Sequence, residues 1–232
     1  MLRRMIFPLV LGLGGCALLI GLGVWQVQRL AWKTGVLAEI EARIDAPPQE
    51  IPADPDPTAD RYLPVTVAGG FEGEALRVLV SPGNEGPGYR IIGAFETEGG
   101  RRIMVDRGFV PEDRKDAARP GGAATVTGNL HWPDETDGFT PDPDRAGNVW
   151  FARNVSLMAE ALETEPVLVV ARQVDGPEAG ITPLPVGTEG IPNDHLEYAI
   201  TWFSLAVIWA GMTGLLLWRI RQRATAGNGQ GQ

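Results

Sequence analysis

Two long uncharged runs lie near the two ends of the chain. The first extends from Met5 to Gln28 and the second from Tyr198 to Trp218. A helix of about 20 apolar residues covers the roughly 30 Å of hydrocarbon in a bilayer. Soluble helices of this length normally keep a polar face, so two buried core helices are the less favoured alternative. The pattern therefore predicts transmembrane helices over residues 5–28 and 198–218.

A signal sequence is an alternative interpretation of the first run. Arg3 and Arg4 precede the apolar stretch, and the segment 13–16 resembles a lipoprotein cleavage box. The apolar run continues well beyond that box, however, which favours an uncleaved anchor. Cys16 is the only cysteine, so we expect neither an intramolecular disulfide nor cysteine-linked haem.

The charges predict how the two helices are oriented. Segments 1–4 and 219–232 together hold five arginines and no acidic residue. The positive-inside rule places both tails in the cytoplasm and the intervening chain on the opposite side. Because no transit peptide precedes the first run, we expect a bacterial inner membrane protein with a periplasmic middle domain.

The middle of the chain is strongly acidic. Between Arg29 and Glu197 there are 15 basic and 29 acidic residues, a net charge of −14. Such a domain repels nucleic acid and anionic headgroups. We therefore expect contacts with membrane lipid or with a protein partner, and none with nucleic acid.

A linker and a β-rich domain are predicted between the two runs. Helical character continues to Ile44, and five prolines then follow within 46–57, so residues 29–61 read as a helical extension and a Pro-rich linker. Short segments rich in Val, Ile and aromatic residues, bounded by Gly, Pro or Asp, predict strands in the remainder. These segments are 62–71, 76–81, 89–96, 101–107, 125–130 and 167–174.

One helix is predicted within this β-rich domain. It covers Val155 to Leu162, with Asn154 as its N-cap. Residues 62–197 are accordingly expected to form a mainly antiparallel β domain, a barrel or barrel-like sandwich with a minor helix.

Candidate chemistry centres on one of the two histidines. Motifs for nucleophilic catalysis, phosphate loops, dinucleotide binding or paired-histidine metal sites do not occur in the sequence. His131 lies at a predicted strand end, where a structural role is expected. His195 instead precedes the second run and shares a helical face with Tyr198, Ala199 and Trp202. That face could hold a haem with imidazole as the iron ligand, although the residues alone favour helix capping or an interfacial position.

Two further patterns concern the membrane helices. Trp25, Arg29 and Trp32 fall on one helical face, and indoles next to cations are typical of the membrane interface. Small residues recur every fourth position, in Ala206, Ala210 and Gly214 and in Ala17 and Gly21. Such stripes allow close helix approach. They leave open whether the helices pack together, against another membrane protein or in a homo-oligomer.

Several motifs together resemble one family. The chain is similar, in order and over nearly its whole length, to the Surfeit locus protein family of cytochrome c oxidase assembly factors. The motifs that carry this resemblance are GVWQ at 23–26 with Arg29 and Lys33, YLPV at 62–65 leading to GGF at 69–71, VDRGFVP at 105–111, and NDHLEYAITW at 193–202.

The resemblance implies a non-enzymatic role in assembling the oxidase. The protein would assist insertion of haem A into cytochrome c oxidase subunit one, as a transient haem A-binding chaperone. Its partners would be oxidase subunit one, haem A synthase and membrane lipid. The resemblance also implies that His195 ligates the haem A iron. The helical face that His195 shares with Tyr198, Ala199 and Trp202 would then lie against the haem. Trp25 and Arg29 are interface anchors first, and contact of Arg29 with a haem propionate or a partner is a secondary hypothesis.

Two departures and two alternatives accompany this interpretation. Asp106 and Phe109 stand where the family commonly has Asn and Trp, which qualifies any role for that loop. One alternative is a structural scaffold or accessory subunit of the oxidase that binds no haem. A two-span sensor is disfavoured, because only 14 residues (219–232) follow the second run as an output module.

Overall fold

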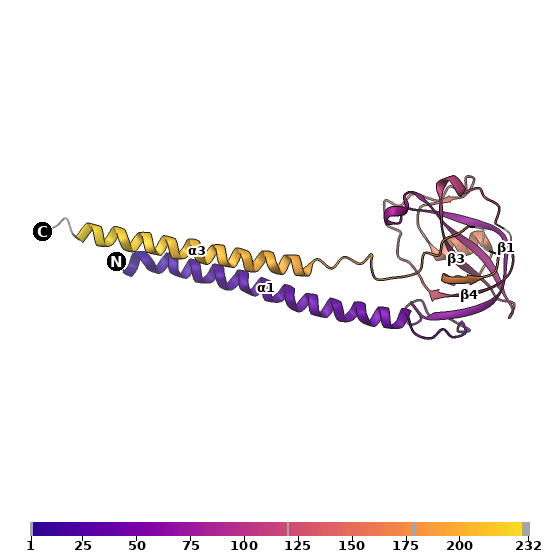
Figure 1. Cartoon of the computed structure of the whole chain (residues 1–232), viewed down its shortest axis with the longest axis horizontal. Coiled ribbons are helices and arrows are strands. Elements are labelled where there is room, and N and C mark those ends of the chain that lie inside the picture. Colours follow the sequence, from indigo (N-terminus) through magenta and orange to yellow (C-terminus); the bar gives the residue numbers. More distant parts are fainter. Residues whose placement is uncertain (1, 120, 178–179, 229–232) are drawn as a thin grey trace. The chain divides into compact units, whose positions relative to one another are not determined.

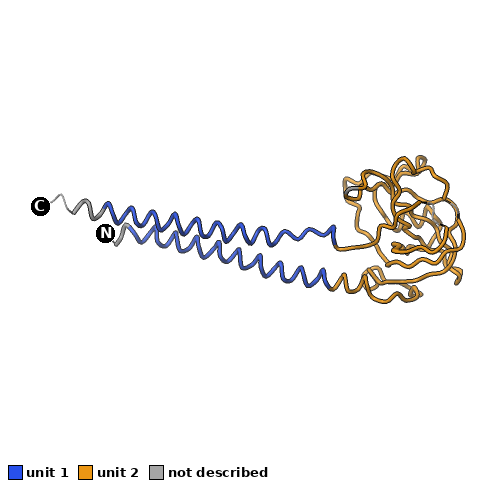
Figure 2. The backbone as a smooth tube through the Cα atoms, viewed as in Figure 1, with its two compact units in different colours: residues 1–38, 189–232 blue, residues 39–188 orange. Residues whose placement is uncertain are grey.

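The computed structural model describes residues 2–119, 121–177 and 180–228, and Figure 1 traces its elements along the chain. Met1 and residues 229–232, which belong to the two predicted cytoplasmic tails, lie outside the described residues. The chain forms two compact units, coloured separately in Figure 2. We call residues 1–38 with 189–232 the helical unit and residues 39–188 the sheet unit.

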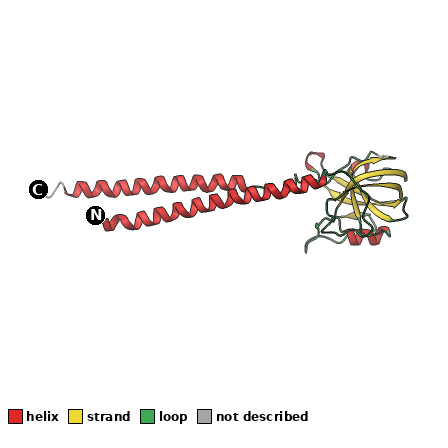
Figure 3. Ribbon diagram, turned by 90° about the horizontal axis from the view of Figure 1, so that it is seen from below, coloured by secondary structure: helices red, strands yellow, loops and turns green. Residues whose placement is uncertain are grey.

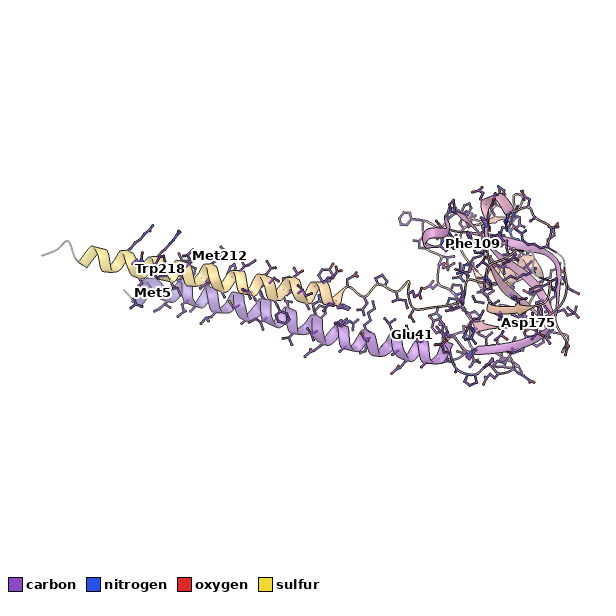
Figure 4. The ribbon with its side chains drawn as sticks, viewed as in Figure 1. Met5, Glu41, Phe109, Asp175, Met212 and Trp218 are labelled. Atoms are coloured by element: carbon purple, nitrogen blue, oxygen red, sulfur yellow. The ribbon has the colours of Figure 1, made fainter. Side chains whose placement is uncertain are left out.

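Two long helices, α1 (Leu2–Ile44) and α3 (His195–Asn228), supply the helical unit. Both are long and apolar enough to cross a membrane, and only 6% of the most apolar window of each is buried. Large apolar side chains therefore face outward, and Met212 and Trp218, labelled in Figure 4, are 63% and 55% exposed. Apolar surface of this extent is unusual on a soluble protein. The two predicted apolar helices are thus present, and they are consistent with a membrane protein.

Glycines allow α1 and α3 to pack closely against each other. A Cβ built on Gly12 would lie 2.1 Å from Cγ2 of Thr213, and one built on Gly15 would lie 2.3 Å from Nε1 of Trp209. The indole Nε1 of Trp209 donates a hydrogen bond to the carbonyl oxygen of Gly12 at 3.1 Å. Large side chains of α3 therefore pack against the glycines of α1, where no Cβ atom is in the way. Small residues are also enriched at the contacts between helices in membranes.

The predicted stripes of small residues contribute little to this contact. Ala206 is 6% exposed, and its carbonyl oxygen accepts a weak hydrogen bond from Sγ of Cys16 at 3.9 Å. Gly21 and Gly214 are exposed, and a Cβ built on either would have no neighbour within 4 Å. Ala206 of the predicted stripes therefore lies in the contact between α1 and α3, whereas Gly21 and Gly214 face outward, and packing of that face against another membrane protein stays a prediction.

Six strands form a mixed sheet in the sheet unit, drawn in yellow in Figure 3. They are β1 (Pro64–Val80), β2 (Gly88–Thr97), β3 (Arg102–Pro111), β4 (Gly122–Leu130), β5 (Val149–Trp150) and β6 (Leu168–Asp175). Their order is β2-β3-β6-β4-β1-β5, and β1 pairs with β2 as well. Four pairings are antiparallel, as expected, whereas β3 pairs with β6 and β1 with β5 in parallel.

β1 combines two strands that the sequence predicts as separate. The expected break corresponds to a register shift between Glu72 and Leu76 in the pairing with β2. Gly73, inside this shift, has φ +66°, a conformation that L side chains rarely adopt. The turn-like residues therefore form a bulge that bends one long strand. β5 was not predicted, because a strand of only two residues is too short to show an alternating pattern of apolar and polar residues.

The helix α2 (Val155–Leu162) covers one face of the sheet. It matches the predicted bounds, and Oδ1 of Asn154 accepts a hydrogen bond from the backbone N–H of Leu157 at 3.1 Å, which confirms the N-cap. Side chains alternate across β3, so that Ile103 packs in one buried cluster and Met104 in another with Met158 of α2. Both faces of the sheet are therefore packed.

Candidate functional site

His195 is the first residue of α3 and is half-buried. Its backbone position is set by the start of the helix, where the N–H of Tyr198 donates to the carbonyl oxygen of Asp194 at 3.2 Å. Pro192 lies three residues before His195, outside the helix, and its carbonyl oxygen accepts a hydrogen bond from Nζ of Lys33 on α1. The residues before α3 are thereby tied to α1 within the helical unit.

A buried glutamine holds the imidazole of His195. Nδ1 of His195 lies 2.7 Å from Oε1 of Gln26 on α1, and Gln26 is only 8% exposed. An amide oxygen can only accept a hydrogen bond, so Nδ1 carries the proton and donates it. In a neutral imidazole that carries its proton on Nδ1, Nε2 keeps the lone pair with which it binds a metal ion.

The other predicted site residues of α3 differ in how far they are exposed. Ala199, one turn after His195, is 2% exposed and therefore buried. Tyr198 is 55% exposed, and Trp202 is half-buried. The accessible surface beside His195 is thus contributed by Tyr198 and Trp202 and hardly at all by Ala199.

The predicted residues of α1 lie on either side of Gln26. Trp25 is 53% exposed, and the guanidinium carbon of Arg29 stands 3.9 Å from the ring centroid of Trp32. This cation–π contact brings together two of the three residues expected on one interfacial face. Arg29 itself is exposed and can reach an anionic group.

Gln26 ends the GVWQ motif but was not predicted as a residue of the haem site. Its signal was a hydrogen-bonding side chain inside an otherwise apolar run, because such a side chain needs a partner once it is buried. That partner lies 169 residues away along the chain, so the sequence alone could not identify it.

The second histidine occupies a structural position in the sheet unit. His131 is 9% exposed, stacks on Tyr62 at 5.4 Å between ring centroids, and its Nδ1 has no hydrogen-bond partner in the part of the chain that the structure describes. Burial, followed by the charges of Arg153 and Arg61, lowers the pKa of His131 to about 4. Among the described residues no cluster of three His, Cys, Asp or Glu side chains could hold a metal ion.

The motif VDRGFVP at 105–111 lies within β3 and not in a loop, and it belongs to a buried charge network. Asp106 is fully buried, and its Oδ2 lies 2.7 Å from an amino group of Arg90 and 3.3 Å from one of Arg153. Arg153 also pairs with Glu135. Although burial opposes it, hydrogen bonding to Arg153 keeps the pKa of Glu135 below its usual value. Asp106 therefore stabilises the fold of the sheet unit.

Comparison with known proteins places these residues in a family context. A model described as the SURF1 family matches residues 13–207, a stretch that includes Gln26 and His195. The chain is 30% identical over 212 residues to human "Surfeit locus protein 1", covering 80% of this chain and 69% of that protein. It is 30% identical over 210 residues to the Xenopus tropicalis protein of the same name, covering 79% and 67%. It is also 29% identical over 214 residues to a "SURF1-like protein" of Monosiga brevicollis, covering 83% and 80%.

Proposed function

Because the chain belongs to the SURF1 family, we propose that it is a cytochrome c oxidase assembly factor that binds haem A on its way to oxidase subunit one. It acts as a chaperone without catalysing a reaction, and haem A synthase and oxidase subunit one are its partners. The farnesylated haem is safest within the bilayer, where the apolar surfaces of α1 and α3 would contact it.

The observation that carries this proposal is the hydrogen bond between His195 and Gln26. Metal-ligating histidines almost always donate their second ring N–H to an oxygen, which sets the tautomer and the ring orientation. Gln26 supplies that oxygen at 2.7 Å from Nδ1. His195 is thereby prepared to present Nε2 to the haem A iron before the haem arrives.

A carrier must also release its cargo, and a single ligand favours release. The other histidine, His131, is buried in the sheet unit and is unsuited to serve as a second axial ligand. His195 is half-buried at the end of an apolar helix, where a competing ligand can reach the iron. Arg29 is exposed near Gln26 on α1 and is proposed to pair with a haem propionate.

The proposed setting is a bacterial inner membrane. The five arginines in the two tails favour cytoplasmic termini, and the acidic sheet unit then faces the periplasm. Placement of the protein there would put His195 at the periplasmic end of α3.

Co-expression with the haem A synthesis enzymes tests the proposal. The purified native chain is expected to carry haem A, identified by its absorption and pyridine-haemochrome spectra, and His195→Ala is expected to lose the haem without losing the folded protein. Far-UV circular dichroism checks that the variant is folded. A haem-free native chain that still captures oxidase subunit one would instead support the scaffold alternative.

Gln26 offers a second test with a matched control. Gln26→Leu removes the acceptor for Nδ1, and loss of such a supporting hydrogen bond typically weakens metal binding about 10- to 100-fold. Gln28→Leu makes the same chemical change two residues away at an exposed position and is expected to leave haem affinity unchanged. Titration of the haem-free proteins with haem A compares the two. Equal affinities for both variants would contradict the role assigned to Gln26.

A further inference from the structure

An apolar groove of about 330 Å³ lies between α1 and α3 in the helical unit. It is lined by three residues between Pro8 and Gly12 and by six between Trp209 and Arg219. α1 begins and α3 ends on this side of the unit, as Figure 1 shows. The volume falls in the range of small-molecule sites, about 300–1,000 Å³. We call this space the α1–α3 groove.

The packing of the two helices creates the groove. Gly12 is buried, and a Cβ there would lie 2.1 Å from Cγ2 of Thr213, so the helices meet closely at its floor. Leu11 on α1 and Leu215 on α3 are 53% and 48% exposed, so their side chains stand open beside that contact. The groove thus has an apolar rim and a floor formed by the helix contact.

One charged side chain belongs to the lining. Arg219 is the only charged residue of the groove in the part of the chain that the structure describes, and it is exposed. No hydrogen bond or ion pair joins its side chain to another described residue. Its guanidinium group is therefore available to an external partner.

Acidic residues are distant from Arg219 along both helices. In α3 the last acidic residue is Glu197, 22 residues or about 33 Å before Arg219. In α1 the first is Glu39, 27 residues or about 40 Å after Gly12. The two tails contain five arginines and no acidic side chain. Positive charge is therefore in excess at this end of the two helices, and it favours an anionic partner.

The position of Arg219 relative to the apolar run indicates the kind of anion. Arg219 directly follows the uncharged run that ends at Trp218, so it marks the level at which hydrocarbon gives way to headgroups. Thr213, at the floor, lies six residues earlier, about 9 Å deeper along α3. The groove therefore extends from the hydrocarbon to the level of the phosphates. A ligand that fits both parts carries an apolar chain joined to an anionic head.

We propose that the α1–α3 groove binds one acyl chain of an anionic phospholipid while Arg219 binds the phosphate of that lipid. A guanidinium group forms paired hydrogen bonds with phosphate oxygens. Basic pockets between transmembrane helices on the cytoplasmic side are typical sites for anionic lipid headgroups. The orientation proposed above places the groove in the cytoplasmic leaflet.

This lipid site is separate from the proposed haem site. Trp209, the first lining residue of α3, comes 14 residues after His195, about 21 Å along the helix. The lipid site rests on insertion of the helices into a membrane and not on haem A binding. Lipid and haem are detected by different signals on the same purified chain, so either proposal can fail without the other.

Calorimetric titration of the full chain in detergent tests the lipid site. The probes are phosphatidylglycerol and phosphatidylcholine with identical acyl chains, which differ in the net charge of their headgroups. Phosphatidylglycerol is expected to bind at least about 10-fold more tightly, the effect of one charged hydrogen bond. Inorganic phosphate in excess should not displace it, because burial of the acyl chain contributes to its affinity. Equal affinity for the two lipids, or displacement by phosphate, would overturn the proposal.

Two pairs of variants show whether the lipid binds in the α1–α3 groove. Arg219→Gln removes the guanidinium from the lining, and Arg223→Gln removes an exposed guanidinium one turn later that is not part of it. Leu11→Trp adds bulk to the rim, and Leu13→Trp adds the same bulk at an exposed residue outside the lining. The four side chains are exposed, so the contact between α1 and α3 is retained.

Arg219→Gln is expected to weaken phosphatidylglycerol binding at least about 10-fold and to change phosphatidylcholine binding less than about twofold. Leu11→Trp is expected to weaken the binding of both lipids, because it fills space that the acyl chain occupies. Each control should leave both affinities unchanged. Equal weakening by Arg219→Gln and Arg223→Gln would show general attraction to the basic tail, and equal weakening by the two tryptophan variants would show contact along the whole helix surface. Either result would refute the site.

Discussion

Replacement of Asp106 is predicted to destabilise the sheet unit strongly. Asp106 is fully buried, and Arg90 and Arg153 both direct amino groups at its Oδ2. Their side chains are only 13% and 11% exposed, so Asp106→Ala would leave two buried guanidinium groups without their shared counter-ion. Removal of one partner from a buried ion pair typically costs about 3–5 kcal/mol.

The remaining contacts of this network set limits on the loss. Arg153 keeps Glu135, and Arg90 keeps a hydrogen bond to the carbonyl oxygen of Leu184 at 3.0 Å. We therefore expect Asp106→Ala to lower the free energy of unfolding by about 3 kcal/mol, the lower end of that range. Asp106→Asn retains an acceptor for the N–H of Gly108, 3.1 Å away, but it also removes the shared counter-ion and turns an NH2 group toward the two arginines, so a similar cost of about 3 kcal/mol is expected.

Urea unfolding followed by tryptophan fluorescence measures these losses in the full chain. A matched control removes an exposed ion pair: Arg145 and Glu160 lie 3.9 Å apart with side chains 54% and 70% exposed. Glu160→Ala is expected to cost less than about 1 kcal/mol. If Asp106→Ala costs no more than Glu160→Ala, the buried network does not stabilise the sheet unit in the way argued.

Two further predictions concern helix contact and pH. Gly15→Val is expected to separate α1 from α3. Disulfide crosslinking of Cys16 to a cysteine introduced by Ala206→Cys should then fall severalfold. Gly14→Val is the control and should leave the crosslinking yield unchanged, because nothing lies within 4 Å of a Cβ at Gly14. The lowered pKa of His131, about 4, means that the unfolded chain binds a proton more readily, so stability should fall by about 2–3 kcal/mol as the pH drops from 6.5 to about 4. His131→Gln should flatten that part of the pH profile in urea unfolding, and an unchanged slope would contradict the assignment.

Local signals in the sequence were sufficient for many elements of the fold. α2 and its cap at Asn154 could be predicted because both depend on residues that are close together in the chain. The apolar helices follow from composition alone. The bulge in β1 was predicted as a turn between two strands. A glycine such as Gly73 is typical of both a turn and a bulge, and only the pairing with β2 distinguishes the two.

Long-range contacts were beyond sequence reasoning. The parallel pairing of β3 with β6 joins Met104 to Leu168, and no local pattern specifies such a partner. The hydrogen bond from His195 to Gln26 likewise joins residues from separate segments. For this reason the candidate site could be located at the start of the second apolar run, while the residue that orients its imidazole could not.

Ligation of the haem A iron by Nε2 of His195 is the central claim, and a rescue titration tests it most directly. His195→Gly should bind haem A at least about 10-fold more weakly than the native chain. Free imidazole, added to the variant, should restore the Soret spectrum of the native complex, because it can replace the missing ligand. Native-like affinity of His195→Gly without imidazole, or an identical effect of imidazole on both proteins, would contradict the assignment of His195 as the haem ligand.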